Sequence, residues 1–422
     1  MRSELYQSDW VLPIAAPVIE QGVVAVEAGK IAWIGAYDAL PDRYAQDKIR
    51  RLRGVMLPGL VNAHTHLQYS RFSAIGKSQF RDFGHWCEAF EVAFNAVTDP
   101  EDWADAAADG ARQALATGTT VFSDVITHDE ARGAFNACCG TGIEYLEVIG
   151  ALDESWADHG RSAFLKRLDA EAPATAGISP HAPYSVDPDV IRDLVKIAHE
   201  RNMRLHSHLA ESVEEEALYQ HGGKTILEIY GCLRDQFAMV REGGAGLNAA
   251  QLADSLGLLT DKTHIAHGIY LDKAQRDMLL ASGTRVALCP RSNATIGLAE
   301  APVAAYLKEG HDICVGTDSL ASAPSLDLMD DVAALYGIAR HQGYEEPDLA
   351  ARLITAATAA GARALGLDGA GYGALSAGGP ADFAVFDLDA ERKDLESTVV
   401  QEAAGRCVLT VARGGVMHDV TP

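Results

Sequence analysis

The chain has 422 residues, of which 48% are hydrophobic, so it is long and apolar enough to bury a large core. Its formal net charge of −24 would repel nucleic acid and anionic membrane surfaces, and we expect neither as a partner. The chain shows no apolar leader and no run that approaches a membrane span, which predicts a soluble, cytoplasmic protein; the sequence leaves its oligomeric state open, with a homo-oligomer as one option.

Strand-like segments separated by glycine, proline and charged residues occupy residues 1–54, and the same texture returns at residues 370–422. Each end of the chain has too few strands to bury a sheet face by itself. We therefore predict that the two ends form one composite β-sandwich domain. Residues 55–369 are then a second domain, inserted between the two halves of the first.

The inserted segment alternates apolar strands with alanine-rich helical stretches, which is typical of βα units and a parallel sheet. In chain order, the predicted strands are 58–66, 119–124, 143–149, 176–181, 203–209, 263–267, 284–290 and 312–318. Eight units over this length favour a (β/α)8 TIM-type barrel, with a doubly wound open sheet as the alternative. The C-terminal ends of barrel strands carry the chemistry of this fold, and polar residues accumulate at these ends. They are His64, His66, Asp124, Glu147, His181, His208, His267 and Asp318.

The first predicted strand ends in His64 and His66, which point to the same face because side chains alternate along a strand. Two imidazoles in this arrangement suit one metal ion, although the pair alone is equally compatible with a structural role. His208 ends the fifth strand and Asp318 ends the eighth, which lies beside the first once a barrel closes. Three imidazoles and a carboxylate predict a divalent transition metal, most simply Zn²⁺, with a position left for water. A turn or cap role for Asp318 is the alternative.

Further polar residues stand where they could act on a substrate at this centre. Glu211 follows His208 at the start of an acidic helix, where its carboxyl group could reach water at the metal. The next acids, Glu214 to Glu216, are expected to form a solvated helix face. His267 ends the sixth strand and is predicted to hydrogen-bond the attacking oxygen. His181 precedes a proline-bounded loop, where it either contacts substrate or stiffens the loop.

Several motifs together resemble the amidohydrolase superfamily over essentially the whole chain. The motifs are Pro58-Gly59-Leu60-Val61-Asn62-Ala63-His64-Thr65-His66-Leu67, His181-Ala182-Pro183-Tyr184, His208-Leu209-Ala210-Glu211, His267-Gly268-Ile269, Cys289-Pro290-Arg291-Ser292-Asn293 and Gly316-Thr317-Asp318-Ser319. They are similar to those of its nucleoside and purine deaminase branch. No lysine stands near His181 on the fourth strand, so the two-metal site of related hydrolases is not expected.

The resemblance implies hydrolytic deamination of an adenine-type ring at one metal, Zn²⁺ or alternatively Fe²⁺. It implies that the ligands are His64, His66, His208 and Asp318, and that Glu211 carries protons to the ring nitrogen. It also implies that His267 supports the attacking oxygen and that His181 contacts the substrate. Glu211, His267 and Asp318 would then be the catalytic residues.

Within the branch, the chain looks most similar to the group that deaminates 6-aminodeoxyfutalosine in menaquinone biosynthesis. Gln68 after the histidine pair, the loop with Arg81 and Trp86, Glu147 on the third strand and Ser319 are the expected substrate contacts. Glu147 could accept hydrogen bonds from ribose hydroxyls, and the loop with Arg71, Arg81, Phe83 and Trp86 could hold an aromatic carboxylate tail. Packing and solvent exposure are equally good explanations for that loop.

Other substrates remain open. They are methylthioadenosine, S-adenosylhomocysteine and adenosine, or the substrate of a related chlorohydrolase or amidohydrolase. The carboxylate-binding arginine expected near Glu147 in an S-adenosylhomocysteine deaminase is missing from that region of the sequence. A binding protein of the same fold without activity should have lost a ligand, and every predicted ligand is present.

Overall fold

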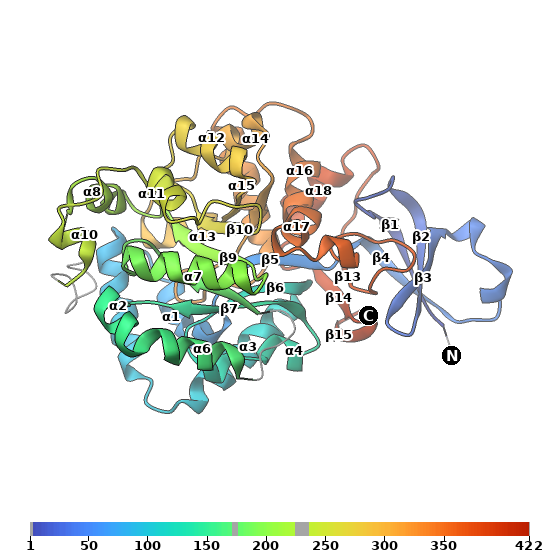
Figure 1. The fold of residues 1–422 in the computed structure, drawn as a ribbon. Helices are drawn as coiled ribbons and strands as arrows, with labels where there is room; N and C mark the ends of the chain where they lie inside the picture. Colours follow the sequence, from blue (N-terminus) through green and yellow to red (C-terminus); the bar gives the residue numbers. More distant parts are fainter. Residues whose placement is uncertain (1–2, 171–175, 224–235, 422) are drawn as a thin grey trace.

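The computed structural model describes residues 3–170, 176–223 and 236–421. Its strands form two sheets, one of eight strands and one of seven. In Figure 1 the seven-stranded sheet lies at one end of the molecule, where the first and last parts of the chain meet, and helices surround the eight-stranded sheet.

The eight-stranded sheet is a TIM-type barrel, as the sequence predicts. Its strands are β5 (Leu60–Thr65), β6 (Thr119–Ile126), β7 (Thr141–Val148), β8 (Ala176–Pro180), β9 (Leu205–Leu209), β10 (Thr263–His267), β11 (Arg285–Leu288) and β12 (Ile313–Val315). Each strand pairs in parallel with the next one along the chain. A parallel bridge between Thr65 and Asp318 joins the first strand to the segment that follows the last. The barrel therefore closes at its C-terminal end, beside the predicted metal ligands.

The barrel strands are apolar because both of their faces are covered. All eight residues of β6 are buried, and so are all five of β9 and of β10. The covering helices bury one face each. For example, α7 (Pro188–Glu200) begins with a proline at its first turn and buries Val190, Ile191 and Leu194 against the barrel.

The remaining helices connect the strands or cover the sheets. They are α1 (Ser73–Gly76), α2 (Phe83–Ala96), α3 (Glu101–Ala116), α4 (Ala134–Ala137), α5 (Asp153–Ser155), α6 (Arg161–Asp169), α8 (Val213–His221), α10 (Ala238–Arg241), α11 (Ala249–Ser255), α12 (Lys273–Ser282), α13 (Pro290–Ile296), α14 (Val303–Glu309), α15 (Leu328–His341), α16 (Leu349–Thr355), α17 (Gly361–Leu365) and α18 (Leu395–Glu402).

The two ends of the chain share the other sheet, which confirms the prediction that their strands form one structure. Its strands are β1 (Glu4–Val11), β2 (Ile19–Glu27), β3 (Lys30–Ala36), β4 (Ile49–Pro58), β13 (Phe383–Phe386), β14 (Cys407–Ala412) and β15 (Gly415–Asp419). They are hydrogen-bonded as one sheet in the order β15-β14-β13-β4-β1-β2-β3, in which β13 pairs with β4. One core of this sheet joins Tyr6 and Met56 to Phe383 and Val411.

Strand β4 runs through the domain boundary predicted between residues 54 and 55, and its residues 55–58 pair with β13. The division into 1–54 with 370–422 and 55–369 stays a proposal. Among the helices of the described residues, none is long and apolar enough to cross a membrane. The sequence left the role of residues 222–256 open; of these, residues 224–235 lie outside the described residues.

Candidate active site

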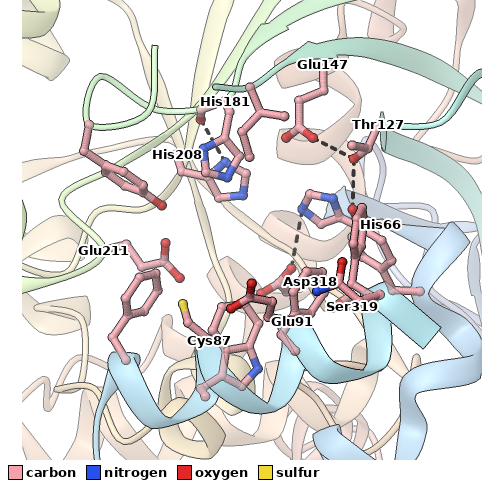
Figure 2. A pocket seen from close by; sticks show the side chains of 18 residues that line it. His66, Cys87, Glu91, Thr127, Glu147, His181, His208, Glu211, Asp318 and Ser319 are labelled. Atoms are coloured by element: carbon pink, nitrogen blue, oxygen red, sulfur yellow. Dashed lines mark hydrogen bonds and ion pairs between the residues drawn. The ribbon is translucent and has the colours of Figure 1, made fainter. Parts of the chain in front are cut away.

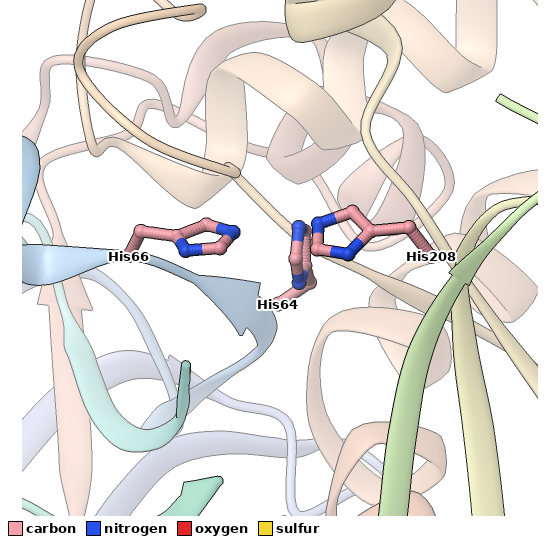
Figure 3. A group of neighbouring side chains, drawn as sticks. All are labelled: His64, His66 and His208. Carbon is pink, nitrogen blue, oxygen red and sulfur yellow. The ribbon is translucent and has the colours of Figure 1, made fainter. Parts of the chain in front are cut away.

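Histidines from two strands converge at the C-terminal end of the barrel. His64 and His66 come from β5 and its end, and His208 comes from β9, on the opposite side of the barrel. One ring nitrogen from each can be chosen so that the three lie within 4.8 Å of one another (Figure 3). The same criterion groups His64 with His267 and Asp318. The structure therefore brings together every residue predicted to bind the metal.

Asp318 is held in this centre by the closure of the barrel. Its backbone N–H donates to the carbonyl of His64 (3.0 Å), and Thr65 Oγ1 donates to its carbonyl (2.9 Å). Carboxylate oxygen Oδ2 accepts hydrogen bonds from Ser292 (2.7 Å) and Ser322 (2.8 Å). Oδ1 is thereby turned toward the histidines and lies 3.4 Å from Nε2 of His64. Burial alone would raise the pKa of Asp318, but the close approach of the His64 imidazole holds this pKa well below its usual value.

The imidazoles carry lone pairs that the described residues leave unused. Nδ1 of His64 is paired with Nε2 of His206 (3.0 Å), and Nδ1 of His208 is paired with the carbonyl of His181 (2.9 Å). Nε2 of His64 and Nδ1 of His66 are buried, and within the described residues neither has a hydrogen-bond partner. Buried polar atoms without partners are costly in a folded protein. A cation at Nε2 of His64 would remove that cost there, and Nε2 of His66, 3.7 Å from Oδ1 of Asp318, faces the same point.

The protonation state of the histidines also suits a metal, because only a neutral imidazole can be a ligand. Burial lowers the pKa of His64 and His208, and it lowers the pKa of His66 to about 3. Three neutral imidazoles and an ionised carboxylate match the donor set of Zn²⁺ and similar transition metals. The residues present thus fit the predicted metal.

Glu211 lies beside this centre and faces the same cavity (Figure 2). It follows Ala210, whose backbone φ of 53° turns the chain sharply after β9. Its Oε1 lies 3.5 Å from Nε2 of His267. Burial and the nearby charge of Asp318 raise the pKa of Glu211 well above its usual value, which favours the protonated form of its carboxyl group.

The expectation that Glu214 to Glu216 form a solvated face is wrong for Glu215. Glu215 is buried, and its carboxylate accepts hydrogen bonds from the backbone N–H groups of Ala210 (2.8 Å), Glu211 (2.6 Å) and Ser212 (3.0 Å). A capping box between Ser212 and Glu215 begins α8. Glu215 therefore fixes the turn that presents Glu211, because satisfying these amides needs a buried acceptor at this position.

His267 and His181 flank the centre. His267 Nδ1 is 3.1 Å from Oδ1 of Asn293, in the short helix α13. His181 Nδ1 is 2.6 Å from the hydroxyl of Ser185, a bond that ties the loop after β8. Since His181 also lines the cavity, the structure is compatible with both roles considered for it, substrate contact and loop stiffening.

Backbone strain is concentrated at this end of the barrel. Ala210, His267 and Asp318 all have positive φ, at 53°, 72° and 57°, and each follows or ends a barrel strand. Such conformations cost on the order of 1–3 kcal/mol each for residues other than glycine and are typical of functional sites. These backbone conformations turn the chain after strands β9, β10 and β12 toward the metal-ligand cluster.

A cavity of about 390 Å³ opens above the centre, which is within the range of small-molecule sites. Of the residues predicted to contact substrate, Glu147, Trp86, Ser319 and His181 line it. Glu147 Oε2 accepts a hydrogen bond from Thr127 (2.6 Å), while burial raises the pKa of Glu147 to about 7.

The structure does not bring Gln68 and Arg81 into the cavity lining. The amide of Gln68 is buried behind the wall and donates to the hydroxyl of Thr127 (2.9 Å). Arg81 is exposed and pairs with Asp82 (2.9 Å). Arg71, which was expected near the substrate tail, pairs with Asp102 and Asp105 instead.

Sequence reasoning missed part of the wall that α2 provides. Phe90, Glu91, Phe94 and Asn95 line the cavity, and Figure 2 shows Cys87 and Glu91 on the helix below it. The signal for this wall was the spacing of Trp86, Phe90 and Phe94, which stand four residues apart on one helix face. The same spacing is common in buried helices, so the sequence alone could not distinguish a core face from a cavity wall.

Comparisons with known proteins identify the family of this chain and several of its relatives. The model of the amidohydrolase family matches residues 55–417. A 5-methylthioadenosine/S-adenosylhomocysteine deaminase of Nitratidesulfovibrio vulgaris (strain DP4) is 27% identical over 399 residues, covering 89% of this chain and 81% of its own. One with the same description from Haloarcula marismortui is 28% identical over 355 residues, covering 82% of this chain and 75% of its own.

Two solved structures show the same fold. An adenosine deaminase from Xanthomonas campestris with bound zinc has a TM-score of 0.77 at 23% identity and covers 99% of this chain and 93% of its own. The aminofutalosine deaminase of Helicobacter pylori has a TM-score of 0.76 at 21% identity, with coverage of 98% and 99%. At these identities the likeness establishes the architecture only.

Proposed function

The chain belongs to the amidohydrolase family and is a hydrolase of carbon–nitrogen bonds, and we propose that it releases ammonia from C6 of an adenine nucleoside. One observation carries the proposal. A metal-ligand cluster and a buried carboxyl group with a raised pKa, Glu211, face the same small cavity. Hydrolytic deamination needs both, because water must be activated while the ring nitrogen next to the reacting carbon receives a proton.

His64, His66, His208 and Asp318 would hold the metal. When bound there, a divalent metal lowers the pKa of water toward neutrality and so supplies the nucleophile. Zn²⁺ is the proposed metal, and Fe²⁺ is the alternative that elemental analysis can distinguish.

The residues of the chain would then move the protons. Glu211 donates its proton to N1 of the adenine ring as the water oxygen bonds to C6. Asp318 takes the proton that the water gives up through Oδ1, the oxygen not engaged by Ser292 and Ser322. That proton passes to the amino nitrogen, which leaves as ammonia when the C6–N bond breaks, and the proton still on the C6 oxygen returns to Glu211 as the ring carbonyl forms. His267, 3.5 Å from Glu211, supports the attacking oxygen through Nε2.

The group attached to C5′ of the ribose has two candidates. Relatives described as methylthioadenosine/S-adenosylhomocysteine deaminases cover most of this chain, which supports a thioether nucleoside. The aromatic residues of α2 in the cavity wall would also suit the aromatic tail of 6-aminodeoxyfutalosine, which would link the enzyme to menaquinone biosynthesis. Glu147, buried in the wall, is the proposed acceptor for ribose hydroxyls.

Elemental analysis and an ammonia assay on the purified protein test the proposal. We expect about one transition metal per chain and ammonia release from at least one of adenosine, methylthioadenosine, S-adenosylhomocysteine and 6-aminodeoxyfutalosine. His208→Ala should lose the metal and the activity together, because a ligand is removed. His199→Ala, which changes an exposed histidine of α7, should retain both. A protein without metal and without deamination of any of the four nucleosides would refute the proposal.

A further inference from the structure

The orientation of a nucleoside in this cavity follows from where its reacting carbon, C6, must lie. C6 of adenine must face the metal-ligand cluster and Glu211, which form the inner end of the cavity. The ribose is attached at N9, on the other side of the fused ring, so the C5′ substituent points toward the outer walls. Those walls are the cavity face of α2 and the segment around Ile149, whereas Glu147 lies closer to the metal-ligand cluster, beside His181 and His208.

The α2 wall carries Glu91 and Asn95, and its apolar part is built of aromatic rings in contact. The ring centroids of Trp86 and Phe90 are 5.4 Å apart, and those of Phe90 and Phe94 are 5.8 Å apart. All three rings are only partly buried, although they line a cavity. Ile149, on the segment after β7, is 43% exposed and also lines it. An apolar substituent placed here would cover this apolar surface and gain its burial.

The wall is also fixed in place, so its shape is available before substrate binds. The indole N–H of Trp86 donates to the carbonyl of Ala321 (2.8 Å), three residues beyond Asp318. The backbone N–H of Phe80 donates to the carbonyl of Thr295 in α13 (2.9 Å). A Cβ at Gly297 would lie 2.5 Å from the carbonyl oxygen of Phe80, so only glycine allows this approach. The start of α2 is therefore tied to the loops that carry the metal centre.

The charges around the cavity are unfavourable for an anionic substituent. Across residues 3–170, 176–223 and 236–421, no lysine or arginine lines the cavity, whereas Glu91 and Glu147 both do. The arginines described near this wall have other partners. Arg167, for example, donates to the backbone carbonyls of Glu147 (2.6 Å) and Ile126 (2.7 Å), behind the wall. Among the described residues, a carboxylate entering this space would meet acids without a compensating cation.

From these observations we infer that the enzyme selects adenine nucleosides whose C5′ substituent is apolar and uncharged, and discriminates against substituents that carry a carboxylate. The inference rests on the proposed deamination and narrows its substrate class. Methylthioadenosine belongs to the favoured class. S-Adenosylhomocysteine and 6-aminodeoxyfutalosine, which both carry a carboxylate, belong to the disfavoured class.

A matched pair of substrates separates the effect of the charge of the C5′ group from the effect of its shape. Adenosine-5′-carboxamide and adenosine-5′-carboxylate have nearly the same shape and differ in charge at neutral pH. We expect the metal-loaded enzyme to deaminate the carboxamide with a kcat/KM about tenfold or more above that of the carboxylate. Methylthioadenosine should exceed S-adenosylhomocysteine by a similar factor. Equal values within both pairs, or higher values for the carboxylates, would overturn the inference.

Variants at Ile149 and Phe90 test which wall of the cavity produces the selectivity for the C5′ substituent. Ile149→Arg places a cation at an exposed position of the lining and should raise kcat/KM for the carboxylate relative to the carboxamide about tenfold, whereas the uncharged control Ile149→Gln should not. Phe90→Ala should reduce the preference for methylthioadenosine over adenosine about tenfold, because apolar contact is lost. The control Val92→Ala, at a 74% exposed position of α2 outside the lining, should leave that preference unchanged.

The outcomes separate this inference from the proposed function. If the metal-loaded protein releases ammonia from none of the nucleosides, the deaminase proposal fails, and the substrate class falls with it. If it releases ammonia from charged and uncharged nucleosides alike, the deaminase proposal stands and only the selectivity is refuted. The same carboxylate-to-carboxamide ratio in the Ile149→Arg and Ile149→Gln variants would refute the placement of the substituent beside Ile149.

Discussion

Burial beside Asp318 favours the protonated form of Glu211, because both the lost hydration and the neighbouring charge raise its pKa. A group in this state can donate a proton to a ring nitrogen. Glu211→Gln preserves the size of the side chain and a hydrogen-bond donor, but it cannot transfer a proton. We expect this variant to retain its metal and to lose about 10²- to 10⁴-fold in kcat.

Elemental analysis and the ammonia assay, made on the same preparation, measure both effects of Glu211→Gln. His208→Ala provides the opposite pattern, in which the metal itself is lost. A Gln variant that turned over at the wild-type rate would show that Glu211 is not the proton donor.

Single residues were predictable from the sequence where one simple rule fixed their position. His64, His66, His208 and Asp318 end predicted parallel strands, and the ends of such strands meet at one face of a barrel. Arg81 could not be placed in this way. It precedes α2 in a connecting segment, and the choice between the cavity and a nearby aspartate depends on contacts that no local pattern specifies.

At the scale of elements, the capping residue Glu215 at the start of α8 also holds the turn that carries the proposed proton donor, Glu211. The carboxylate of Glu215 accepts three backbone N–H groups of the turn that carries Glu211, as well as the hydroxyl of Tyr219 (3.0 Å). Glu215→Gln removes one of the two oxygens that accept these bonds. We expect kcat to fall about 10- to 100-fold through displacement of Glu211, with the metal content unchanged.

Glu214→Gln is the matched control for this variant. It makes the same change at the preceding position of the same turn, where the side chain is half-buried, and should keep kcat near the wild-type value. The comparison uses kcat at saturating nucleoside, the metal content and the free energy of unfolding. If Glu215→Gln were as active as Glu214→Gln, the turn would not depend on this carboxylate.

The strands of the barrel were easier to predict than those of the terminal sheet. A parallel strand covered on both faces is a nearly continuous apolar run, and all eight such runs correspond to strands β5 to β12. Strand β1 mixes buried and exposed residues, and the first half of β4 carries three arginines, so neither gave a clear apolar pattern. The wall formed by α2 was missed for a different reason, since its aromatic spacing resembles that of a core helix.

At the scale of the whole molecule, Asp382 lies where the two sheets join. Its carboxylate accepts the backbone N–H of Arg413 (2.7 Å), after β14, and its carbonyl accepts that of Gly59 (3.0 Å), between β4 and β5. Burial raises the pKa of Asp382 to about 6 from the ordinary value of 3.8. Below pH 3.8 both the folded and the unfolded states hold the proton, and no stability is lost. As the pH rises toward 6, the unfolded state ionises first, so the folded state loses stability relative to it.

Asp382→Asn removes this titration and keeps an oxygen that can accept from Arg413. The free energy of unfolding of the variant, relative to wild type, should therefore increase by about 1–1.5 kcal/mol between about pH 5 and pH 8. Denaturant unfolding of both metal-loaded proteins at the two pH values measures the difference. Asp389→Asn, at a side chain that is 95% exposed, is the control and should have a small effect at both. A difference for Asp382→Asn that stayed constant with pH would show that the junction of the two sheets does not hold a destabilised carboxylate.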